Sequence, residues 1–258
     1  MEVWERQPTG VVRVRAANPS PLTLDGTNTY VIGRWVVDPG PADPAHVAAV
    51  RSAAGDVEGV VLTHGHADHS ESAESFGVPV HTPGEGEEAG PFRALGTPGH
   101  SADSVCLLMG RICFTGDTVL GMGSVFISPG EGSLSAYLDS LRRLRGLELE
   151  ALCPGHGPYV WDPAAKLDEY LEHRLERERM LLDALEAGLR SPGELLDAAW
   201  PDAPAHLRPA AGLSLQAHME KLEEEGRLPA GVTASGLGPL AVEGHTGDHQ
   251  GHPGELGE

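Results

Sequence analysis

Cysteine is scarce in this chain, and its scarcity bears on the environment in which the protein works. Three cysteines, Cys106, Cys113 and Cys153, occur among 258 residues. Three thiols leave at least one unpaired and cannot form a disulfide framework, so the sequence predicts a reducing compartment. Because Cys153 directly follows Leu152 in an apolar run, we interpret it as a core residue and not as a metal ligand.

Long apolar runs are also missing. The segment from Met1 to Arg6 is charged and has no apolar stretch of the length that a signal peptide or a membrane span requires. We therefore expect a cytoplasmic protein that does not associate with membranes. The sequence carries no signature of an oligomeric state.

Positive charge is in short supply, since 18 Lys and Arg stand against 38 Asp and Glu, a formal net charge of −20. The segment from Pro163 to Ala234 contains eight basic and fourteen acidic residues, a balance of −6. A domain that reads duplex DNA normally presents a basic surface, so the composition argues against duplex DNA as a partner. Arg174, Arg177 and Arg179 form a local basic cluster, which we interpret as surface ion pairs with neighbouring glutamates and not as a phosphate contact.

The most informative segment that is present runs from Thr63 to Ser70, with the sequence THGHADHS, and follows a short apolar run typical of a buried strand. His64 and His66 leave the strand at positions i and i+2 and can point at one ion, whereas Asp68 and His69 are turned toward a neighbouring position. Such a cluster costs desolvation free energy unless a cation is bound. The spacing therefore predicts two adjacent cations, with zinc favoured by the donor types and manganese or iron as alternatives.

Three further segments place a polar residue beside glycine at the end of an apolar run or at a Pro-Gly turn. They are Thr97 to Ser101 with His100, Phe114 to Thr118 with Asp117, and Cys153 to Pro158 with His156. A small neighbour lets the backbone come close to an ion. Alone, His100 or His156 is more typical of an ordinary turn, but together the segments supply the additional ligands that two ions need.

In this combination and order, the four segments resemble the motifs of metallo-beta-lactamase-fold hydrolases, and the resemblance extends from Asn18 to Trp161. It implies an αββα sandwich of the α/β class, with a metal site at the edge where the strand-end loops gather. The implied ligands are His64, His66 and His100 for one ion, Asp68, His69 and His156 for the other, and Asp117 as the bridge. The implied chemistry is hydrolysis by a hydroxide that bridges two zinc ions and that Asp68 orients.

A narrower resemblance comes from Asn18 to Gly33, NPSPLTLDGTNTYVIG, which is similar to the opening of the beta-lactamase-like protein 2 group. Tyr170 to Glu178 resembles the start of the small winged-helix-like domain that this group appends. Since the best-known animal member is a mitochondrial endoribonuclease, the resemblance implies cleavage of phosphodiester bonds in single-stranded RNA.

Two alternatives stay open. Hydroxyacylglutathione hydrolases share the HxHxDH ligands and a helical C-terminal domain, so a small thioester or ester is the competing substrate. The negative charge favours it, because a polyanion is repelled at long range. A non-catalytic metal-binding regulator is the second alternative, although it requires a broken metal site and all seven ligands are present. A dedicated beta-lactamase is disfavoured, because many of those enzymes have cysteine where Asp117 stands.

The remaining catalytic groups are less marked in the sequence. The leaving-group acid is not identifiable, although His173 is a candidate. Thr63, Ser70 and Thr118 are candidates for hydrogen bonds that orient the ligand imidazoles.

The residue pattern divides the chain into a catalytic domain at 1–161, a winged-helix-like helical domain at 162–234 and an acidic tail at 235–258. The first part alternates short strands, at 29–32, 35–37, 60–62, 105–108 and 112–114, with helices at 43–51 and 135–144, which indicates an α/β core. After Trp161 we expect helices that run from Asp162 to Gly188, from Ser191 to Pro201 and from Ala210 to Gly226, followed by an abbreviated wing. The tail is rich in Gly, His, Pro and acid, and we expect it to be disordered.

Overall fold

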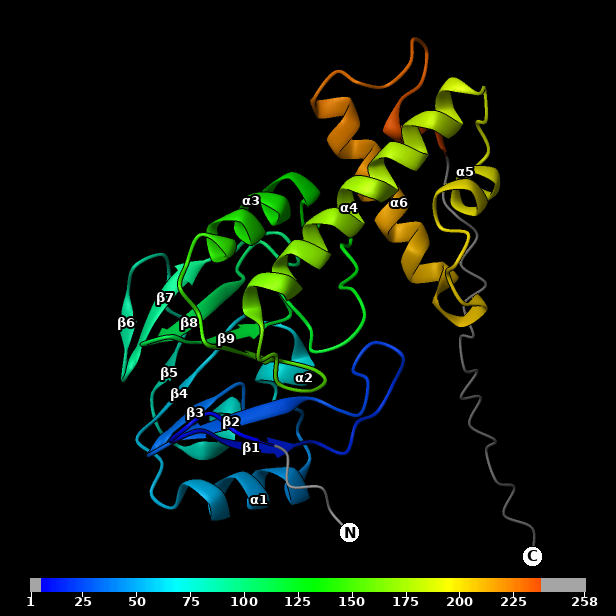
Figure 1. Ribbon diagram of the computed structural model, residues 1–258. Coiled ribbons are helices and arrows are strands. Elements are labelled where there is room, and N and C mark those ends of the chain that lie inside the picture. The colour runs from blue at the N-terminus through cyan, green and yellow to red at the C-terminus, as the bar shows by residue number, and fades with distance from the viewer. Residues whose placement is uncertain (1–5, 238–258) are drawn as a thin grey trace, which may run out of the picture.

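The computed structural model describes residues 6–237 and contains two five-stranded mixed sheets that lie face to face (Figure 1). The first sheet has the order β1 (Val12–Arg15), β2 (Asn28–Ile32), β3 (Trp35–Val37), β4 (Gly59–Val61) and β5 (Val80–His81). The second has the order β10 (Ala151–Pro154), β9 (Ile112–Gly116), β8 (Val105–Met109), β7 (Phe92–Gly96) and β6 (Glu88–Ala89). Strands β3, β4 and β5 pair in parallel, as do β9 and β10.

Helices cover the outer faces of both sheets, as Figure 1 shows for α1 (Pro44–Ala54) below the first sheet and α3 (Leu134–Arg145) above the second. Successive strand residues point to opposite faces of a sheet. In β2, Tyr30 therefore packs between the two sheets, whereas Val31 packs with Val50 of α1. The αββα sandwich expected from the sequence is confirmed, and the strands expected at 29–32, 35–37, 60–62, 105–108 and 112–114 are present within one or two residues.

The C-terminal module is helical and consists of α4 (Pro163–Glu186), α5 (Pro192–Ala199) and α6 (Arg208–Glu224). Asp162 caps α4 by accepting a hydrogen bond from the Ala165 amide, and Ser191 forms a capping box with Glu194 at the start of α5. Each such cap contributes about 1 kcal/mol to helix stability. Within the described residues no strand follows β10, so the module has helices without a β wing.

Helix α4 belongs to two hydrophobic cores. Its first half packs Leu167 and Tyr170 against the residues between α3 and the second sheet, and its second half packs Leu181 and Leu185 against α5 and α6. The helical module is therefore fixed to the sandwich mainly by α4, and α6 adds a second contact through Ala217, which belongs to the first of these cores. The domain boundary at residue 162 stays a prediction, and the tail expected to be disordered lies outside the described residues apart from 235–237.

A search of residues 6–237 finds no helix of the length and apolarity that a bilayer span demands. All three cysteines are buried and free. Cys153 packs in the core between the two sheets, as the sequence predicts.

Candidate metal centre

All seven residues that the sequence predicts as metal ligands come together at one edge of the sandwich, where loops leave β4, β7, β9 and β10. Among residues 6–237 there are three groups in which the potential ligand atoms of the members lie within 4.8 Å of one another: His64, His66 and His100; Asp68, His69 and His156; and Asp38, His64 and His69. The first two are the groups that the resemblance implies. The third contains Asp38, which the sequence analysis did not single out.

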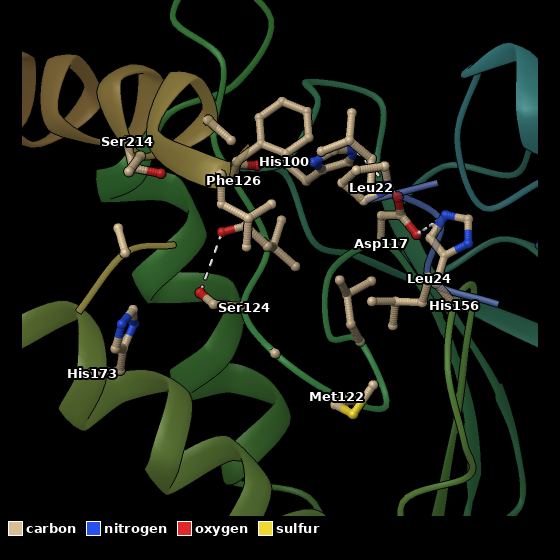
Figure 2. Close-up of a pocket in the computed structure, with 18 of the residues that line it drawn as sticks. Leu22, Leu24, His100, Asp117, Met122, Ser124, Phe126, His156, His173 and Ser214 are labelled. Atoms are coloured by element: carbon tan, nitrogen blue, oxygen red, sulfur yellow. Dashed lines mark hydrogen bonds and ion pairs between the residues drawn. The ribbon is translucent and has the colours of Figure 1, made fainter. Parts of the chain in front are cut away.

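The second group lies beside Asp117, and Figure 2 shows its member His156 facing this carboxylate. His156 Nε2 lies 3.3 Å from both Asp68 Oδ2 and Asp117 Oδ1, and His69 Nε2 lies 3.4 Å from the same Asp117 oxygen. Short helix α2 (Ala67–Ser70) turns Asp68 and His69 toward this position, whereas His66 lies outside the helix as its N-cap. The local turn therefore separates the two halves of the HxHxDH motif, as its spacing predicts.

Hydrogen bonds at the other ring nitrogens fix which atoms of His69 and His156 face the group. His69 donates from Nδ1 to Asp38 Oδ2 at 2.9 Å, and His156 Nδ1 lies 3.4 Å from the Gly26 carbonyl oxygen. A neutral imidazole that donates from Nδ1 has a lone pair on Nε2. The two Nε2 atoms are 3.3 Å apart, so in the neutral rings that ligate a metal two lone pairs face each other. A cation between them removes this repulsion.

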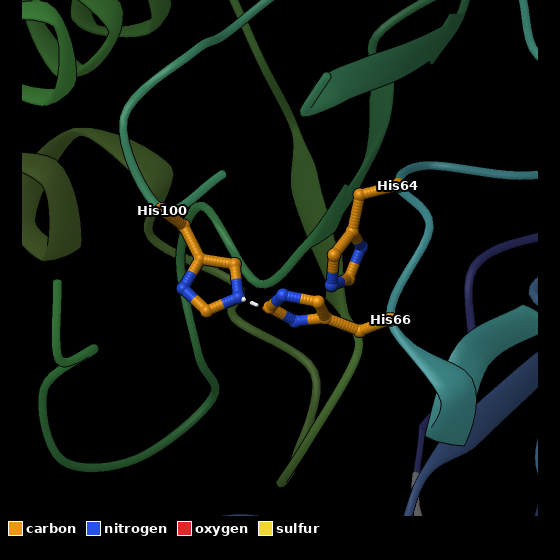
Figure 3. A group of neighbouring side chains, drawn as sticks. All are labelled: His64, His66 and His100. Atoms are coloured by element: carbon orange, nitrogen blue, oxygen red, sulfur yellow. Dashed lines mark hydrogen bonds between the residues drawn. The ribbon is translucent and has the colours of Figure 1, made fainter. Parts of the chain in front are cut away.

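The first group has the same character (Figure 3). His64 Nδ1 is 3.0 Å from the Thr63 hydroxyl, which leaves His64 Nε2 buried without a hydrogen-bond partner. His100 Nδ1 faces the Phe126 carbonyl at 3.3 Å, and His100 Nε2 lies 3.1 Å from His66 Nδ1. A buried polar atom without a partner costs free energy, so the orphaned His64 nitrogen fits a metal ligand.

Asp117 lies between the two groups. Its Oδ1 approaches His69 and His156, whereas its Oδ2 is 3.8 Å from His100 Nε2. Asp117 Oδ1 is buried and makes no hydrogen bond. One carboxylate that directs an oxygen to each group is the geometry that a bridging ligand requires, and the donor set of imidazoles and carboxylates suits zinc, iron or manganese.

Electrostatics also favour positive charge at this edge. Burial by itself lowers the pKa of His156, but the opposing effects of Asp117 and Asp68 are stronger and raise that pKa to about 9. Burial and the neighbouring His69 lower the pKa of His64 to about 3, so its imidazole is neutral at pH 7. The His156 environment therefore attracts a cation, while His64 is in the protonation state that ligates a metal.

Asp38 holds His69 and Thr63 in position through hydrogen bonds. It follows β3 and accepts hydrogen bonds from His69 Nδ1, from the Thr63 amide at 2.8 Å and from the Thr63 hydroxyl at 2.7 Å. Its φ of 49° lies in the left-handed region, which few non-glycine residues adopt. The signal was present in the sequence, because Asp38 stands before Pro39-Gly40 at the end of an apolar run, as the predicted ligands do.

The hydroxyls expected to orient the ligand imidazoles behave differently from one another. Thr63 does so, through His64 Nδ1. For Ser70 and Thr118 the expectation is wrong, since Ser70 donates to the carbonyl oxygens of Gly65 and His66, and the Thr118 hydroxyl pairs with that of Thr97. In the short helix α2 the nearest acceptor for a serine hydroxyl is the carbonyl one turn back.

The segment from Asn18 to Tyr30 braces the site. Thr27 donates to Asp68 Oδ2 at 3.3 Å, Asn28 donates to the carbonyl oxygens of Pro154 and Gly157, and the Tyr30 hydroxyl donates to that of Pro154. The loop that carries His156 is thereby tied to β2. The GTNTY part of the motif therefore positions Asp68 and the loop that carries His156.

We expect Gly155→Ala to disrupt the centre without removing a ligand. A Cβ at this position would lie 2.5 Å from His69 Cε1 and 2.6 Å from Asp117 Oδ1, closer than van der Waals contact allows. Elemental analysis should show loss of about one metal ion per chain, and activity should fall about 10²-fold because small displacements of reacting groups are costly. Gly146→Ala, which meets atoms only at 3.4 Å or beyond, is the matched control. Full metal content in Gly155→Ala would contradict the packing argument.

A cavity of about 650 Å³ opens from the metal centre toward the helical module. Asp68, Asp117, His66, His100 and His156 line one end of it. Its remaining walls are mostly apolar and come from the loops at 20–24 and 120–126, from helices α4 and α6, and from the connection between α5 and α6. Apolar residues among them are Leu22, Leu24, Leu120, Met122, Val125, Phe126, Pro204 and Leu207. His173 of α4 also faces the cavity (Figure 2).

The basic cluster of α4 is only partly what the sequence indicates. Arg179 forms the expected surface ion pairs, with Glu176 and Asp183. Arg177 and Arg174 do not, because both are buried and line the cavity. Arg177 pairs with Asp202 and not with a neighbouring glutamate of its own helix.

Comparison with known protein families gives two matches. Residues 22–76 and 74–156 match the model of the metallo-beta-lactamase superfamily, and residues 191–229 match the model of the beta-lactamase associated winged helix domain.

Similar proteins agree with these matches. The beta-lactamase-like protein 2 homolog of Drosophila melanogaster is 28% identical over an alignment that covers 89% of this chain and 93% of that one. Among solved structures, the metallo-beta-lactamase family protein TTHA1429 from Thermus thermophilus covers 84% of this chain and 94% of its own, with a TM-score of 0.69 and 23% identity. TTHA1623, solved in a di-iron-bound form, covers 63% of this chain and 97% of its own, with a TM-score of 0.51 and 25% identity.

Proposed function

Because the chain belongs to the metallo-beta-lactamase superfamily of hydrolases, we propose that it is a dinuclear metal-dependent hydrolase of esters or thioesters with a largely apolar acyl group. The seven ligands proposed are His64, His66 and His100 for one ion, Asp68, His69 and His156 for the other, and Asp117 between them. When bound, two ions supply ionisation of a water molecule at neutral pH and stabilisation of negative charge on the attacked group. Asp68 is the carboxylate proposed to orient that water.

The observation that carries the substrate class is the cavity. Ligand sites for small molecules are concave and mainly apolar, with a few polar groups that fix orientation. This cavity has that composition, and the metal centre forms its polar end. A volume of about 650 Å³ is enough to enclose a small acyl group.

Single-stranded RNA is the second candidate, and the similarity to beta-lactamase-like protein 2 homologs favours it. Proteins that bind single strands follow the backbone with a positively charged groove. Here the cationic side chains of the cavity, apart from its histidines, are Arg174 and Arg177, and the latter is neutralised by Asp202. The small number of cationic side chains in the cavity and the net charge of −20 both disfavour RNA, so an ester or thioester is the preferred candidate substrate.

A substrate panel on one zinc-loaded preparation tests the proposal. It contains an octanoyl thioester of N-acetylcysteamine, S-lactoylglutathione, nitrocefin and a single-stranded RNA oligonucleotide. We expect the octanoyl thioester to be turned over at least about tenfold better than the other small substrates, with RNA left intact and Asp68→Ala inactive. Cleavage of RNA that Asp68→Ala abolishes, without thioester turnover, would reverse the order of the two candidates. Selective duplex binding that survives His66→Ala would instead indicate a regulator.

Zinc is the proposed native metal, with manganese or iron as alternatives. The donor set does not separate them, and a similar solved protein is described in a di-iron form. Elemental analysis of the protein as purified, followed by removal with a chelator and reconstitution with each metal, identifies the ion that restores the most activity.

A further inference from the structure

The helical module supplies the polar groups at the end of the cavity remote from the metal centre. His173 and Arg174 are adjacent on α4, Arg177 lies one turn further along, and all three line the cavity. Figure 2 shows His173 on the opposite side of the pocket from Asp117 and His156. A substrate with its scissile bond at the metal centre would therefore direct its far end toward α4.

Arg174 is a buried cation without an anionic partner. Its residue is 2% exposed, and no carboxylate within residues 6–237 forms an ion pair with it. The guanidinium donates hydrogen bonds to the Val125 carbonyl and to the Tyr137 hydroxyl and lies 5.5 Å from the Tyr137 ring centroid, while Nε is buried with no partner. A buried charge of this kind is costly unless it is compensated. An anionic ligand in the adjoining cavity would compensate it.

His173 is held as a hydrogen-bond donor beside it. Both carboxylate oxygens of Asp202 accept hydrogen bonds from Arg177, at 2.6 and 2.8 Å, and Arg177 Nε donates to His173 Nε2 at 3.2 Å. With Nε2 as acceptor, the ring proton is on Nδ1. Burial and the two arginines lower the pKa of His173 to about 4, so at pH 7 this imidazole is neutral. It offers one fixed N–H and no charge.

We propose that His173 and Arg174 form a carboxylate-binding subsite, so that the preferred substrate carries a carboxylate at the end of its acyl group remote from the scissile bond. The proposal rests on the hydrolase function above. One cation and one neutral donor match a monoanion with two oxygens. Asp202 and Glu169, which also line the cavity, disfavour a group of higher negative charge. In this proposal the helical module determines which small-molecule substrate is preferred, because it binds the group at the far end of the acyl chain.

Two length-matched thioesters test the subsite in the full-length zinc enzyme: octanoyl-N-acetylcysteamine and its counterpart with a terminal carboxylate. We expect kcat/KM of the wild-type enzyme to be at least about tenfold higher for the carboxylate substrate. Arg174→Met should abolish this preference, because kcat/KM for the carboxylate substrate should fall to the value for the neutral thioester. Arg174→Lys should keep part of the preference. Arg179→Met, an exposed residue of the same helix outside the cavity, should behave as wild type.

The failure of this proposal is distinguishable from failure of the proposed function. Equal turnover of both thioesters by the wild-type enzyme would overturn the subsite and leave the hydrolase standing. If neither thioester is turned over, the hydrolase proposal fails. The subsite is then tested by calorimetry on the same protein, which compares the binding affinity of octanedioic acid monoamide with that of octanamide. Tighter binding of the carboxylate probe that Arg174→Met removes supports it, and equal or absent binding overturns it. Should Arg174→Met fail to fold, His173→Leu must weaken the preference in its place.

Discussion

Asp117→Ala should lower hydrolysis by about 10³-fold or more and leave the protein folded with about one metal ion fewer per chain. Asp117 directs one oxygen to each of the two ligand groups, so its loss removes the bridge and also the charge that holds His69 and His156 in place. A 10³-fold loss corresponds to about 4 kcal/mol of transition-state stabilisation. Initial rates on the octanoyl thioester, together with elemental analysis of the same sample, measure both effects.

The matched control is Asp139→Ala, which removes an exposed aspartate of α3 that pairs with Arg142 at the surface. Surface ion pairs of this kind contribute less than about 1 kcal/mol, so rate and metal content should stay at wild-type values. If Asp117→Ala bound two ions and retained full activity, Asp117 would not be a bridge.

The metal centre was predictable because most of its information is local. In HxHxDH, the spacing alone separates His64 and His66 from Asp68 and His69, and the structure realises that separation with the short helix α2. His100, Asp117 and His156 could be added because each follows the same local pattern at a strand end or turn. The family predicted from these segments is confirmed by the superfamily match over residues 22–156.

Asp38 was not predicted because its role depends on pairing between distant segments. It meets Thr63 only because β3 lies parallel to β4, with Val37 opposite Val61. A single sequence does not state which strands are neighbours.

The prediction for Arg174 was wrong for the same reason. Glutamates at helical spacing indicated surface ion pairs, but the face of α4 that carries Arg174 packs against the loop containing Val125 and against Tyr137. Local spacing defines which residues share a helix face. It does not define whether that face is exposed to solvent or packs against another part of the protein. Here the face packs against the sandwich, so Arg174 is buried and lines the cavity.

Asp38→Asn should weaken binding of the ion held by His69 by about 10- to 100-fold, the usual effect of losing a carboxylate that orients a ligand imidazole. Three donors point at Asp38: His69 Nδ1, the Thr63 amide and the Thr63 hydroxyl. An asparagine has a single acceptor oxygen, so at least one of these donors must face its NH₂ group. Asparagine tolerates a positive φ, which separates the loss of the carboxylate from backbone strain.

Two measurements resolve this effect into its parts. Competition with a metal chelator gives the affinity, and denaturant unfolding of the metal-free protein should show a loss of about 1–3 kcal/mol, the cost of leaving a buried donor unsatisfied. Asp43→Asn is the control, because Asp43 caps α1 and asparagine caps a helix equally well. Wild-type metal affinity in Asp38→Asn would mean that the His69 ring is held by its packing alone, and that the Asp38 carboxylate stabilises the fold without preparing the imidazole to bind an ion.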